Sequence, residues 1–405
     1  MGYRVVITGI GVLSSIGIGR DPFWDGCIQG RGGIRPISGF DVSHLKSKLG
    51  GQLPDINFKD YIEPTNLRRM DRIGKMVVST VRMALDDSGL EMDHEDPNRV
   101  GIMVGTGLGS SKSVDLYYRG LVKEGPTGAT PLLFQTSVPN SICSHSSLEF
   151  GIRGINTTFS HKESSVESAL VFAFGLLRKG DAQVILVGGG DEISEPLYLV
   201  YATLGSLSPQ RSPFPEGMRP FDAHRNGFVL GEGSGILVME ELGHARKRRA
   251  RIYGEVLSIG LSGSNFGVLN YDREGSSLSK AMAHASDGRQ VDYICAAANS
   301  TVDLDLAETR AIKATFADGA RNISISSVKS MIGEFDGSGG IRACATALAV
   351  YHGIVPPTIN YTKPDPDCDL DYTPNEARAR RINTALLNGF SNGGSNISIL
   401  FGRYG

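Results

Sequence analysis

Residues 156–187 read NTTFSHKESSVESALVFAFGLLRKGDAQVILV and contain four segments of different character. The first, 156–160, is rich in Thr and aromatic residues, as strands are. A small and polar elbow separates it from 169–177, an apolar stretch that predicts a buried helix. Gly180 then marks the helix end, and the β-branched run 184–187 predicts a second strand. This order of strand, elbow, helix and strand is typical of an α/β protein.

A second stretch, residues 323–359, has the same order of segments more than 160 residues later: ISISSVKSMIGEFDGSGGIRACATALAVYHGIVPPTI. Residues 323–328 are strand-like, and a glycine-rich elbow leads into the helical stretch 343–352. Gly353 and the extended run 354–359 follow. The shared order suggests a duplicated α/β unit, although few residues are identical between the two copies.

The composition excludes several classes of function. The 405 residues include 41 Lys+Arg and 43 Asp+Glu, so the formal net charge is −2, which argues against a dedicated nucleic-acid binder. Hydrophobic residues make up 40% of the chain and charged residues 21%, as in globular proteins. Short β-branched runs alternate with longer helical stretches, which favours α/β layers; these runs are 5–8, 100–104, 184–187 and 323–326.

The cysteines do not form a recognisable pattern. They are odd in number and widely spaced: Cys27, Cys143, Cys295, Cys344 and Cys368. We therefore expect no disulfide framework and no metal site. The glycine pairs of 9–11 and 105–109 do not complete a GxGxxG motif, so we expect no nucleotide and no other cofactor. No apolar run approaches the roughly 18 residues of a membrane span, and the first residues lack the plan of a signal peptide, so we expect a soluble cytoplasmic protein with no membrane partner.

The most plausible boundary between two halves is the basic stretch 244–251, HARKRRAR, which lies between an apolar run and a strand-like segment. Basic runs are usually solvated helix ends. We therefore divide the chain into an N-terminal half, 1–250, and a C-terminal half, 251–405.

One segment carries a resemblance to a known family. Residues 219–235 read RPFDAHRNGFVLGEGSG. This is similar to the RPFDxxRDGFVxGEGAG signature of β-ketoacyl synthases. Further matching segments follow the family order along the chain: VVITGIGVLSSIG, GIRGINTTFS, AETRAIK, SSVKSMIGEFDGSGG, VPPTINY and NGFSNGGSN. The resemblance implies an α/β, thiolase-like, five-layer αβαβα fold made of two duplicated halves, and an N-terminal half that contains the nucleophile elbow.

In that family a Cys at a helix N-terminus accepts the acyl chain as a thioester, and two His side chains assist decarboxylation of the malonyl extender. This sequence departs from the family at all three positions. Glu163 stands at the nucleophile position, Ala297 at the first His and Glu334 at the second. A carboxylate is a poor acyl acceptor, and a negative charge at Glu334 would repel a developing enolate. We therefore expect no catalytic residue in this chain.

Other family residues are retained, namely Lys329, Asp305, Glu308, Asp222 and Arg225. We interpret two nearby reactive side chains as structural: Cys295 as a small buried hydrophobe and His161 as an elbow residue. A carboxylate at the elbow needs partners. We expect Glu163 either to accept a backbone amide hydrogen bond or to pair with Lys329, and Glu334 to point elsewhere or to share that lysine.

A ketosynthase scaffold without a nucleophile resembles the chain-length factor (KSβ) of type II polyketide synthases. The resemblance implies a heterodimer with an active ketosynthase subunit (KSα), supplied with malonyl and polyketide chains by an acyl carrier protein. The family usually has Gln where this chain has Glu163, and a gating Phe where it has Asn392. The charge of Glu163 puts the secondary decarboxylase activity of that family in doubt.

The chain-length tunnel of that family would be lined here by Lys112, Leu116 and Leu133. Lys112 and Leu116 share one face of a helix because they are four residues apart. Two alternatives stay open: an enzyme that uses Glu163, either a malonyl-carrier decarboxylase or an atypical synthase or acyltransferase, and a binding pseudo-synthase unrelated to polyketides. The polyketide product, the number of extensions and the carrier docking surface do not follow from the sequence.

Overall fold

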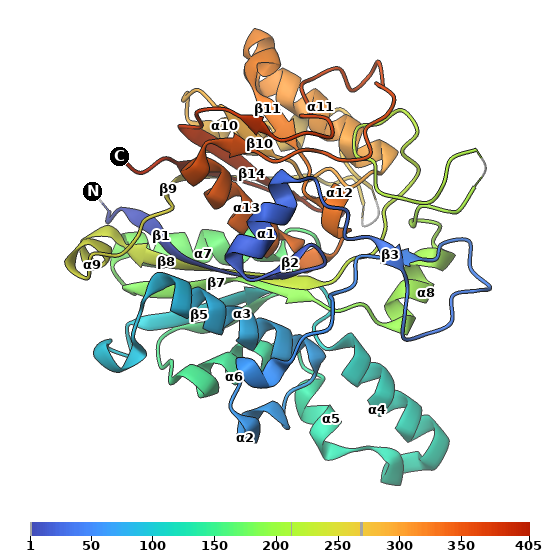
Figure 1. Ribbon diagram of the computed structural model, residues 1–405, viewed down its shortest axis with the longest axis vertical. Coiled ribbons are helices and arrows are strands. Elements are labelled where there is room, and N and C mark those ends of the chain that lie inside the picture. The colour runs from blue at the N-terminus through green and yellow to red at the C-terminus, as the bar shows by residue number, and fades with distance from the viewer. Residues whose placement is uncertain (1, 212, 268–269) are drawn as a thin grey trace.

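The computed structural model describes residues 2–211, 213–267 and 270–405. Two helices lie in the centre of the molecule with a sheet on either side, as Figure 1 shows. These helices are α7 (Ser165–Lys179) and α13 (Gly339–His352). They follow the two elbows of the sequence, so the duplicated units face each other across the centre of the fold.

The strands of the N-terminal half lie in the order β6-β5-β7-β8-β1. β6 pairs with β5 and β5 with β7 in parallel, whereas β7–β8 and β8–β1 are antiparallel. Their bounds are β6 Asn156–Phe159, β5 Val100–Gly105, β7 Val184–Asp191, β8 Gly233–Glu241 and β1 Val5–Ser14.

The C-terminal half repeats this plan in the order β11-β10-β14-β15-β9. The first two pairings are parallel and the next two antiparallel, as in the N-terminal half. The bounds are β11 Ser324–Ser326, β10 Tyr293–Cys295, β14 Thr384–Phe390, β15 Ser395–Gly402 and β9 Gly254–Gly263. β1 also pairs with β9 over Val5–Ile7, so the two sheets meet at one seam. The duplication predicted from the sequence is therefore confirmed in the strand topology.

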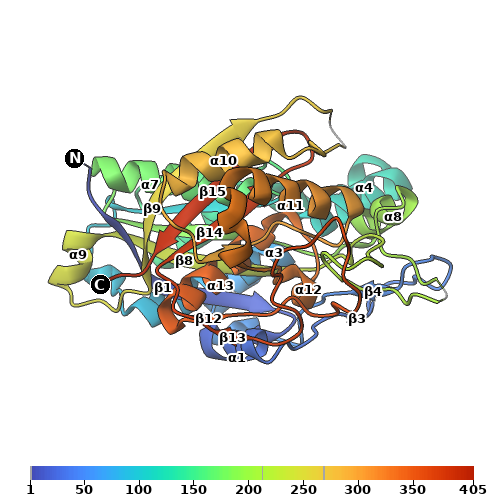
Figure 2. The ribbon, with the colours of Figure 1, turned by 90° about the horizontal axis from the view of Figure 1, so that it is seen from above.

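Two pairs of helices cover the outer faces of the sheets. α3 (Arg72–Ser88) and α6 (Ser141–Phe150) cover the N-terminal sheet, as Figure 1 shows, and α10 (Ser276–Ser286) and α11 (Val302–Phe316) cover the other sheet, as seen from above in Figure 2. The layers therefore follow the sequence helix, sheet, helix, sheet, helix, and the five-layer αβαβα fold is confirmed.

The last element of the second unit differs from its counterpart in the first. A strand follows the second buried helix, as the extended run 354–359 predicted, but it does not join the central sheet. Instead β12 (Ile354–Val355) pairs with β13 (Arg378–Ala379) in a separate two-stranded sheet, and β14 takes the place in the central sheet. Pro356 and Pro357 explain the difference, because proline has no N–H to donate to a sheet.

The remaining elements are short or lie at the periphery. α4 (Ser111–Glu124) and α5 (Pro131–Thr136) form a hairpin that projects from the layers in Figure 1. The others are α1 Arg20–Ile28, α2 Pro64–Leu67, α8 Glu195–Thr203, α9 Leu242–Lys247, α12 Lys329–Ile332, β2 Gly17–Ile18, β3 Arg35–Pro36 and β4 Leu49–Gly50. Within the described residues, no helix is both long and apolar enough to span a bilayer.

The basic stretch 244–251 lies at α9, as a solvated helix end would. Its arginines are engaged locally. Arg248 pairs with buried Glu240 at 2.7 Å, and Arg251 donates to the Tyr253 hydroxyl at 2.9 Å. None of these basic residues lines any of the cavities described below. The stretch therefore stabilises the junction between β8 and β9.

Candidate active-site pocket

The first elbow places Glu163 directly before α7. Lys162 adopts a left-handed backbone conformation (φ 50°), and Ser164 is the residue that precedes the first turn of the helix. The half-buried Glu163 side chain accepts two hydroxyl hydrogen bonds, from Ser391 Oγ to Oε2 at 3.0 Å and from Tyr271 to Oε1 at 3.5 Å. The nucleophile position of the family thus holds a carboxylate fixed by two neutral donors.

Burial raises the pKa of Glu163, and the nearby Glu334 carboxylate adds to the rise. The backbone amide of Glu163 itself opposes the shift, which agrees with the predicted amide interaction. The alternative, an ion pair with Lys329, is wrong. Lys329 Nζ instead donates to Glu334 Oε2 at 2.7 Å and to the Ala297 carbonyl oxygen at 2.9 Å.

Glu334 is held in place by the glycine-rich signature segment. Its backbone N donates to the Val229 carbonyl at 2.8 Å, and its carbonyl accepts from Gly231 N at 2.9 Å. These bonds hold the backbone of Glu334 in place. Glu334 lies only five residues after Lys329 in the sequence, so the lysine side chain reaches its carboxylate across one short loop. Proximity along the chain explains why Lys329 pairs with Glu334 rather than with Glu163.

The third family position, Ala297, carries no polar side chain, but its backbone is fully used. Its N donates to Glu308 Oε1 at 3.0 Å, and the neighbouring Ala298 N donates to Oε2 at 2.8 Å. Asp305, one helical turn earlier, accepts from the backbone N of Asn299 at 2.9 Å. The retained carboxylates of α11 therefore position the loop after β10 rather than contact the pocket.

Two carboxylates that sequence reasoning missed lie beside the three family positions. Asp191, at the end of β7, accepts from Gly337 N at 2.6 Å and from Gly107 N at 3.0 Å, and burial raises its pKa to about 6. Asp336 packs against Gly107, where an added Cβ would lie 2.1 Å from its Oδ2. Burial and the charge of Glu163 raise the pKa of Asp336 well above its usual value.

Glu163, Glu334 and Asp336 line one cavity of about 480 Å³. Its lining combines carboxylates with aromatic rings and amides, and includes Glu163, Glu334, Asp336, Tyr201, Tyr271, Phe228, Phe335, Asn299 and Asn392. Lys162 Nζ donates to Asn392 Oδ1 at 2.7 Å, so the loop after β14 is tied to the elbow at both Ser391 and Asn392. Asn392, which replaces a Phe of the family, therefore closes one side of the cavity through a polar contact.

No cysteine takes part in the lining of this cavity. All five cysteines are buried. Cys295 is fully buried in the core, and burial raises its pKa, in agreement with a structural role. His161 is exposed, and its Nδ1 lies 2.9 Å from Ser168 Oγ. Within the described residues, no cluster of His, Cys, Asp and Glu has the arrangement of a metal site.

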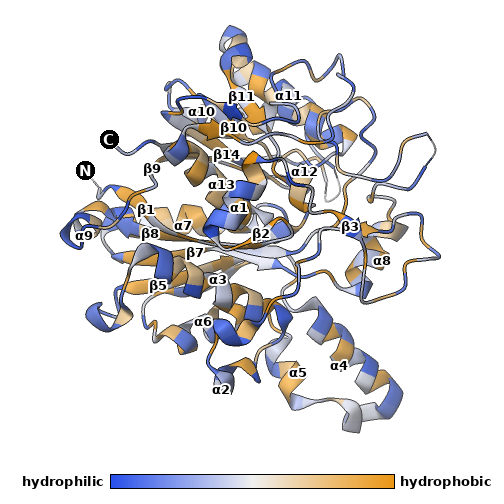
Figure 3. Ribbon diagram, in the orientation of Figure 1, coloured by the Kyte–Doolittle hydropathy of each residue, from blue (hydrophilic) through white to orange (hydrophobic). Residues whose placement is uncertain are grey.

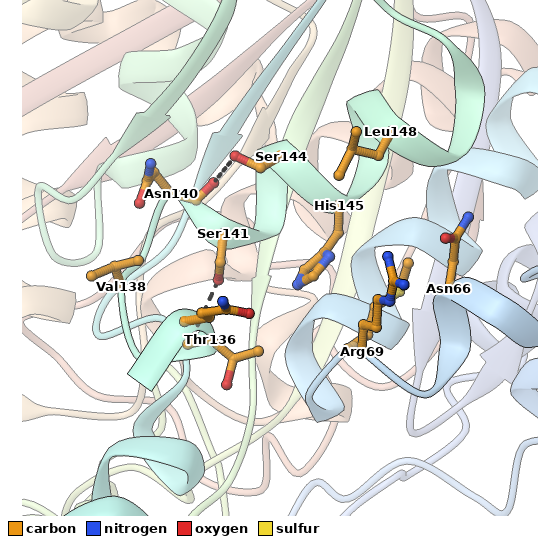
Figure 4. Close-up of a pocket in the computed structure, with 11 residues that line it drawn as sticks. Asn66, Arg69, Thr136, Val138, Asn140, Ser141, Ser144, His145 and Leu148 are labelled. Atoms are coloured by element: carbon orange, nitrogen blue, oxygen red, sulfur yellow. Dashed lines mark hydrogen bonds between the residues drawn. The ribbon is translucent and has the colours of Figure 1, made fainter. Parts of the chain in front are cut away.

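The three tunnel candidates lie together in a different place. Lys112 and Leu116 of α4 and Leu133 of α5 all line a cavity of about 230 Å³, which shares no lining residue with the larger one. A neighbouring cavity of about 380 Å³, drawn in Figure 4, is lined by residues of α6, of the end of α5 and of the segment after α2. The two share Arg69, Met70 and Thr136.

Some of the missed residues had a usable signal in the sequence. Asp336 lies two residues after Glu334, within the segment GEFDGSGG that was aligned with the family. Tyr201 and Tyr271 had no such signal, because they lie outside the matching segments and reach the cavity from α8 and from the loop before α10.

Comparison with known proteins supports the resemblance along the whole chain. Residues 3–245 match the N-terminal domain of β-ketoacyl synthases, and residues 253–362 match the C-terminal domain. The chain is 35% identical to 3-oxoacyl-[acyl-carrier-protein] synthase 2 of Synechocystis sp., and the alignment covers 99% of this chain and 98% of the relative. It is 36% identical to the tetracenomycin polyketide synthase ketoacyl synthase alpha subunit of Streptomyces glaucescens, with 99% and 97% covered.

Among solved structures, the ishigamide ketosynthase/chain length factor has the same fold, with a TM-score of 0.91, 31% identity and 100% of both chains covered. Both domains of one family are therefore matched in order, and relatives align almost from end to end. This chain belongs to the β-ketoacyl synthase family.

Proposed function

We propose that this chain is a non-catalytic chain-length factor that pairs with an active ketosynthase subunit in a type II polyketide synthase. One observation carries the proposal. In the alignment made from the sequence, Glu163, Ala297 and Glu334 stand at the three catalytic positions, and no cysteine lines the cavity that Glu163 and Glu334 share. Condensation needs a nucleophile, so it must take place on another subunit. That subunit would exchange chains with an acyl carrier protein.

The surface of the α4–α5 hairpin supports a partner protein. Large apolar side chains are exposed there, and Figure 3 shows hydrophobic residues on both helices. The exposed fractions are 57% for Leu108, 48% for Leu116, 58% for Tyr118, 83% for Val122, 45% for Leu132, 60% for Phe134 and 45% for Val138. Apolar surface of this extent is typical of an interaction site.

The neighbouring edge of the sheet also supports a partner. β6 is the last strand of its sheet and pairs, among the described strands, only with β5. An unpaired strand edge can add a strand from another chain. Leu148 of α6 and Phe172 of α7, which flank this edge in sequence, are exposed by 77% and 56%.

Co-expression with a candidate ketosynthase subunit tests the proposal. We expect the two chains to copurify as a 1:1 complex, because obligate interfaces of this kind often bury more than about 2,000 Å². Light scattering and native mass measurement would give the stoichiometry. A stable monodisperse monomer at micromolar concentration that does not bind the ketosynthase would contradict the proposal. Release of CO₂ from malonyl-carrier by the purified chain alone would favour the decarboxylase alternative instead.

The position of the tunnel gives a separate prediction. Leu133→Trp is expected to shorten the polyketide made by the complex, because the added ring would occupy the cavity shared by Lys112, Leu116 and Leu133. Mass spectrometry of the released products measures the chain length. Leu261→Trp, at a side chain of β9 that is exposed by 50%, lies outside the hairpin surface and lines none of the described cavities, is the matched control. An unchanged product distribution for Leu133→Trp and for bulky changes at Leu116 would place the tunnel elsewhere.

A further inference from the structure

The charged side chains that line the 480 Å³ cavity are all acidic. Four carboxylates contribute to it: Glu163, Glu334, Asp336 and Asp303. Among the described residues that line it, none is Lys, Arg or His. Aromatic side chains form much of the remaining wall, from Tyr201, Phe228, Tyr271 and Phe335. This lining would repel an anionic extender such as a malonyl group.

A second observation concerns hydrogen-bonding capacity that the fold leaves unused. Glu334 is only 4% exposed, and its Oε1 has no partner in the described part of the chain, although Oε2 is paired with Lys329. Asp336 is half-buried and makes no side-chain hydrogen bond or ion pair with any described residue. A buried carboxylate oxygen without a partner is costly, so Glu334 Oε1 favours a ligand that donates to it.

The balance of charged side chains around the cavity also favours a ligand that donates hydrogen bonds and carries a positive charge. Glu163, Glu334, Asp336 and Asp191 influence one another electrostatically; Lys329 lowers the pKa values of Glu163 and Asp336, and its ammonium is paired with Glu334. The other buried cation nearby, Arg342, is paired with Glu167. Repulsion among the carboxylates would be relieved by one further positive charge in the cavity.

We propose that this cavity binds a small organic cation, a primary ammonium group on a short aliphatic chain. An ammonium carries three N–H donors, which suits the carboxylates of Glu163, Glu334 and Asp336. The rings of Tyr201 and Tyr271 offer cation–π contacts to the same group, and Phe228 and Phe335 offer apolar surface to the chain. Asp303 also lines the cavity and pairs with Arg273 at 2.9 Å, with 42% of its side chain exposed. We place it at the mouth, where a second ammonium could bind.

The proposal is independent of the chain-length role, because it requires no partner subunit. Titration calorimetry of the full-length chain, alone or in its complex, with butylamine and 1,4-diaminobutane tests it at neutral pH. We expect saturable binding with a Kd of about 1 mM or tighter. Butan-1-ol and butanoate have the same chain length without the positive charge, and we expect no binding of either.

Asp336→Asn should weaken amine binding by about tenfold or more, because it replaces a charged acceptor by a neutral amide. Asp93→Asn, at an exposed position that lines none of the described cavities, is the matched control and should leave the affinity unchanged. Butylamine should also raise the Tm of the wild-type chain and not that of Asp336→Asn, which distinguishes lost binding from lost folding. Equal binding of butylamine and butan-1-ol, no saturation by either amine, or unchanged affinity in Asp336→Asn would overturn the proposal.

Discussion

Replacing Arg342 with methionine is expected to lower the free energy of unfolding by about 3 to 5 kcal/mol. Arg342 of α13 and Glu167 of α7 are fully buried and form an ion pair between the two halves of the fold. Arg342 also donates from Nη1 to the Asn388 carbonyl at 2.5 Å. Removing the arginine would leave the Glu167 carboxylate buried without its counter-ion. Urea unfolding followed by circular dichroism measures the change.

The double variant Glu167→Leu/Arg342→Met is the control for this prediction. Glu167 Oε2 and Arg342 Nε have no hydrogen-bond partner in the described chain, so the pair is incompletely satisfied even in the native protein. Replacing both members with apolar side chains of similar volume is therefore expected to recover most of the loss. A single variant as stable as the wild type, or a double variant less stable than Arg342→Met, would contradict the assigned role of the pair.

In the assembled complex, Glu163→Ala is expected to leave the rate of product formation within about twofold of wild type. Loss of the nucleophilic cysteine of the partner subunit is expected to lower it by at least about 10³-fold, as is usual when a covalent nucleophile is removed. The contrast follows from the geometry, because Glu163 is fixed by two neutral hydroxyl donors, Ser391 and Tyr271. Product formation measured on both complexes, at equal concentrations of carrier, gives the comparison.

Glu163→Gln serves as the conservative control, since it keeps the shape and the acceptor for Ser391 while removing the charge. If Glu163→Ala abolished product formation while native mass measurement still gave an intact complex, Glu163 would be a catalytic residue. Retention of activity by Glu163→Gln alone would then indicate that its hydrogen bonds matter, whereas loss in both variants would indicate that its charge does.

The fold could be predicted from the sequence to a large extent, because strand, elbow, buried helix and strand are local patterns that occur twice. The local pattern did not say which sheet the extended run 354–359 joins, and two prolines prevent its ladder hydrogen bonds with the central sheet. The strand that replaces it, β14, lies some 30 residues later, after a long loop. Such a connection is set by tertiary packing, which local patterns do not contain.

Two of the residues that line the large cavity, Glu163 and Glu334, were singled out from the sequence, but their hydrogen-bond partners were not. The positions of Glu163, Ala297 and Glu334 followed from alignment with a known signature. The partner of Lys329 could not be predicted, because Glu163 and Glu334 were both candidates. The backbone hydrogen bonds between Glu334 and the segment around Val229 place the Glu334 carboxylate within reach of the lysine, and these bonds are known only from the structure. Asp336 and Asp191 were missed since their importance arises from burial next to other acids, a property of the folded chain.

The group of acids around the elbow also bears on how this lineage could change. Replacing Glu163 by cysteine would place a thiol near the Glu334 carboxylate, which helps to raise the pKa of Glu163. Negative neighbours and burial raise a thiol pKa, so the new cysteine would stay protonated and weakly nucleophilic. A cysteine at position 163 alone is therefore not expected to supply the thiolate that acyl transfer needs.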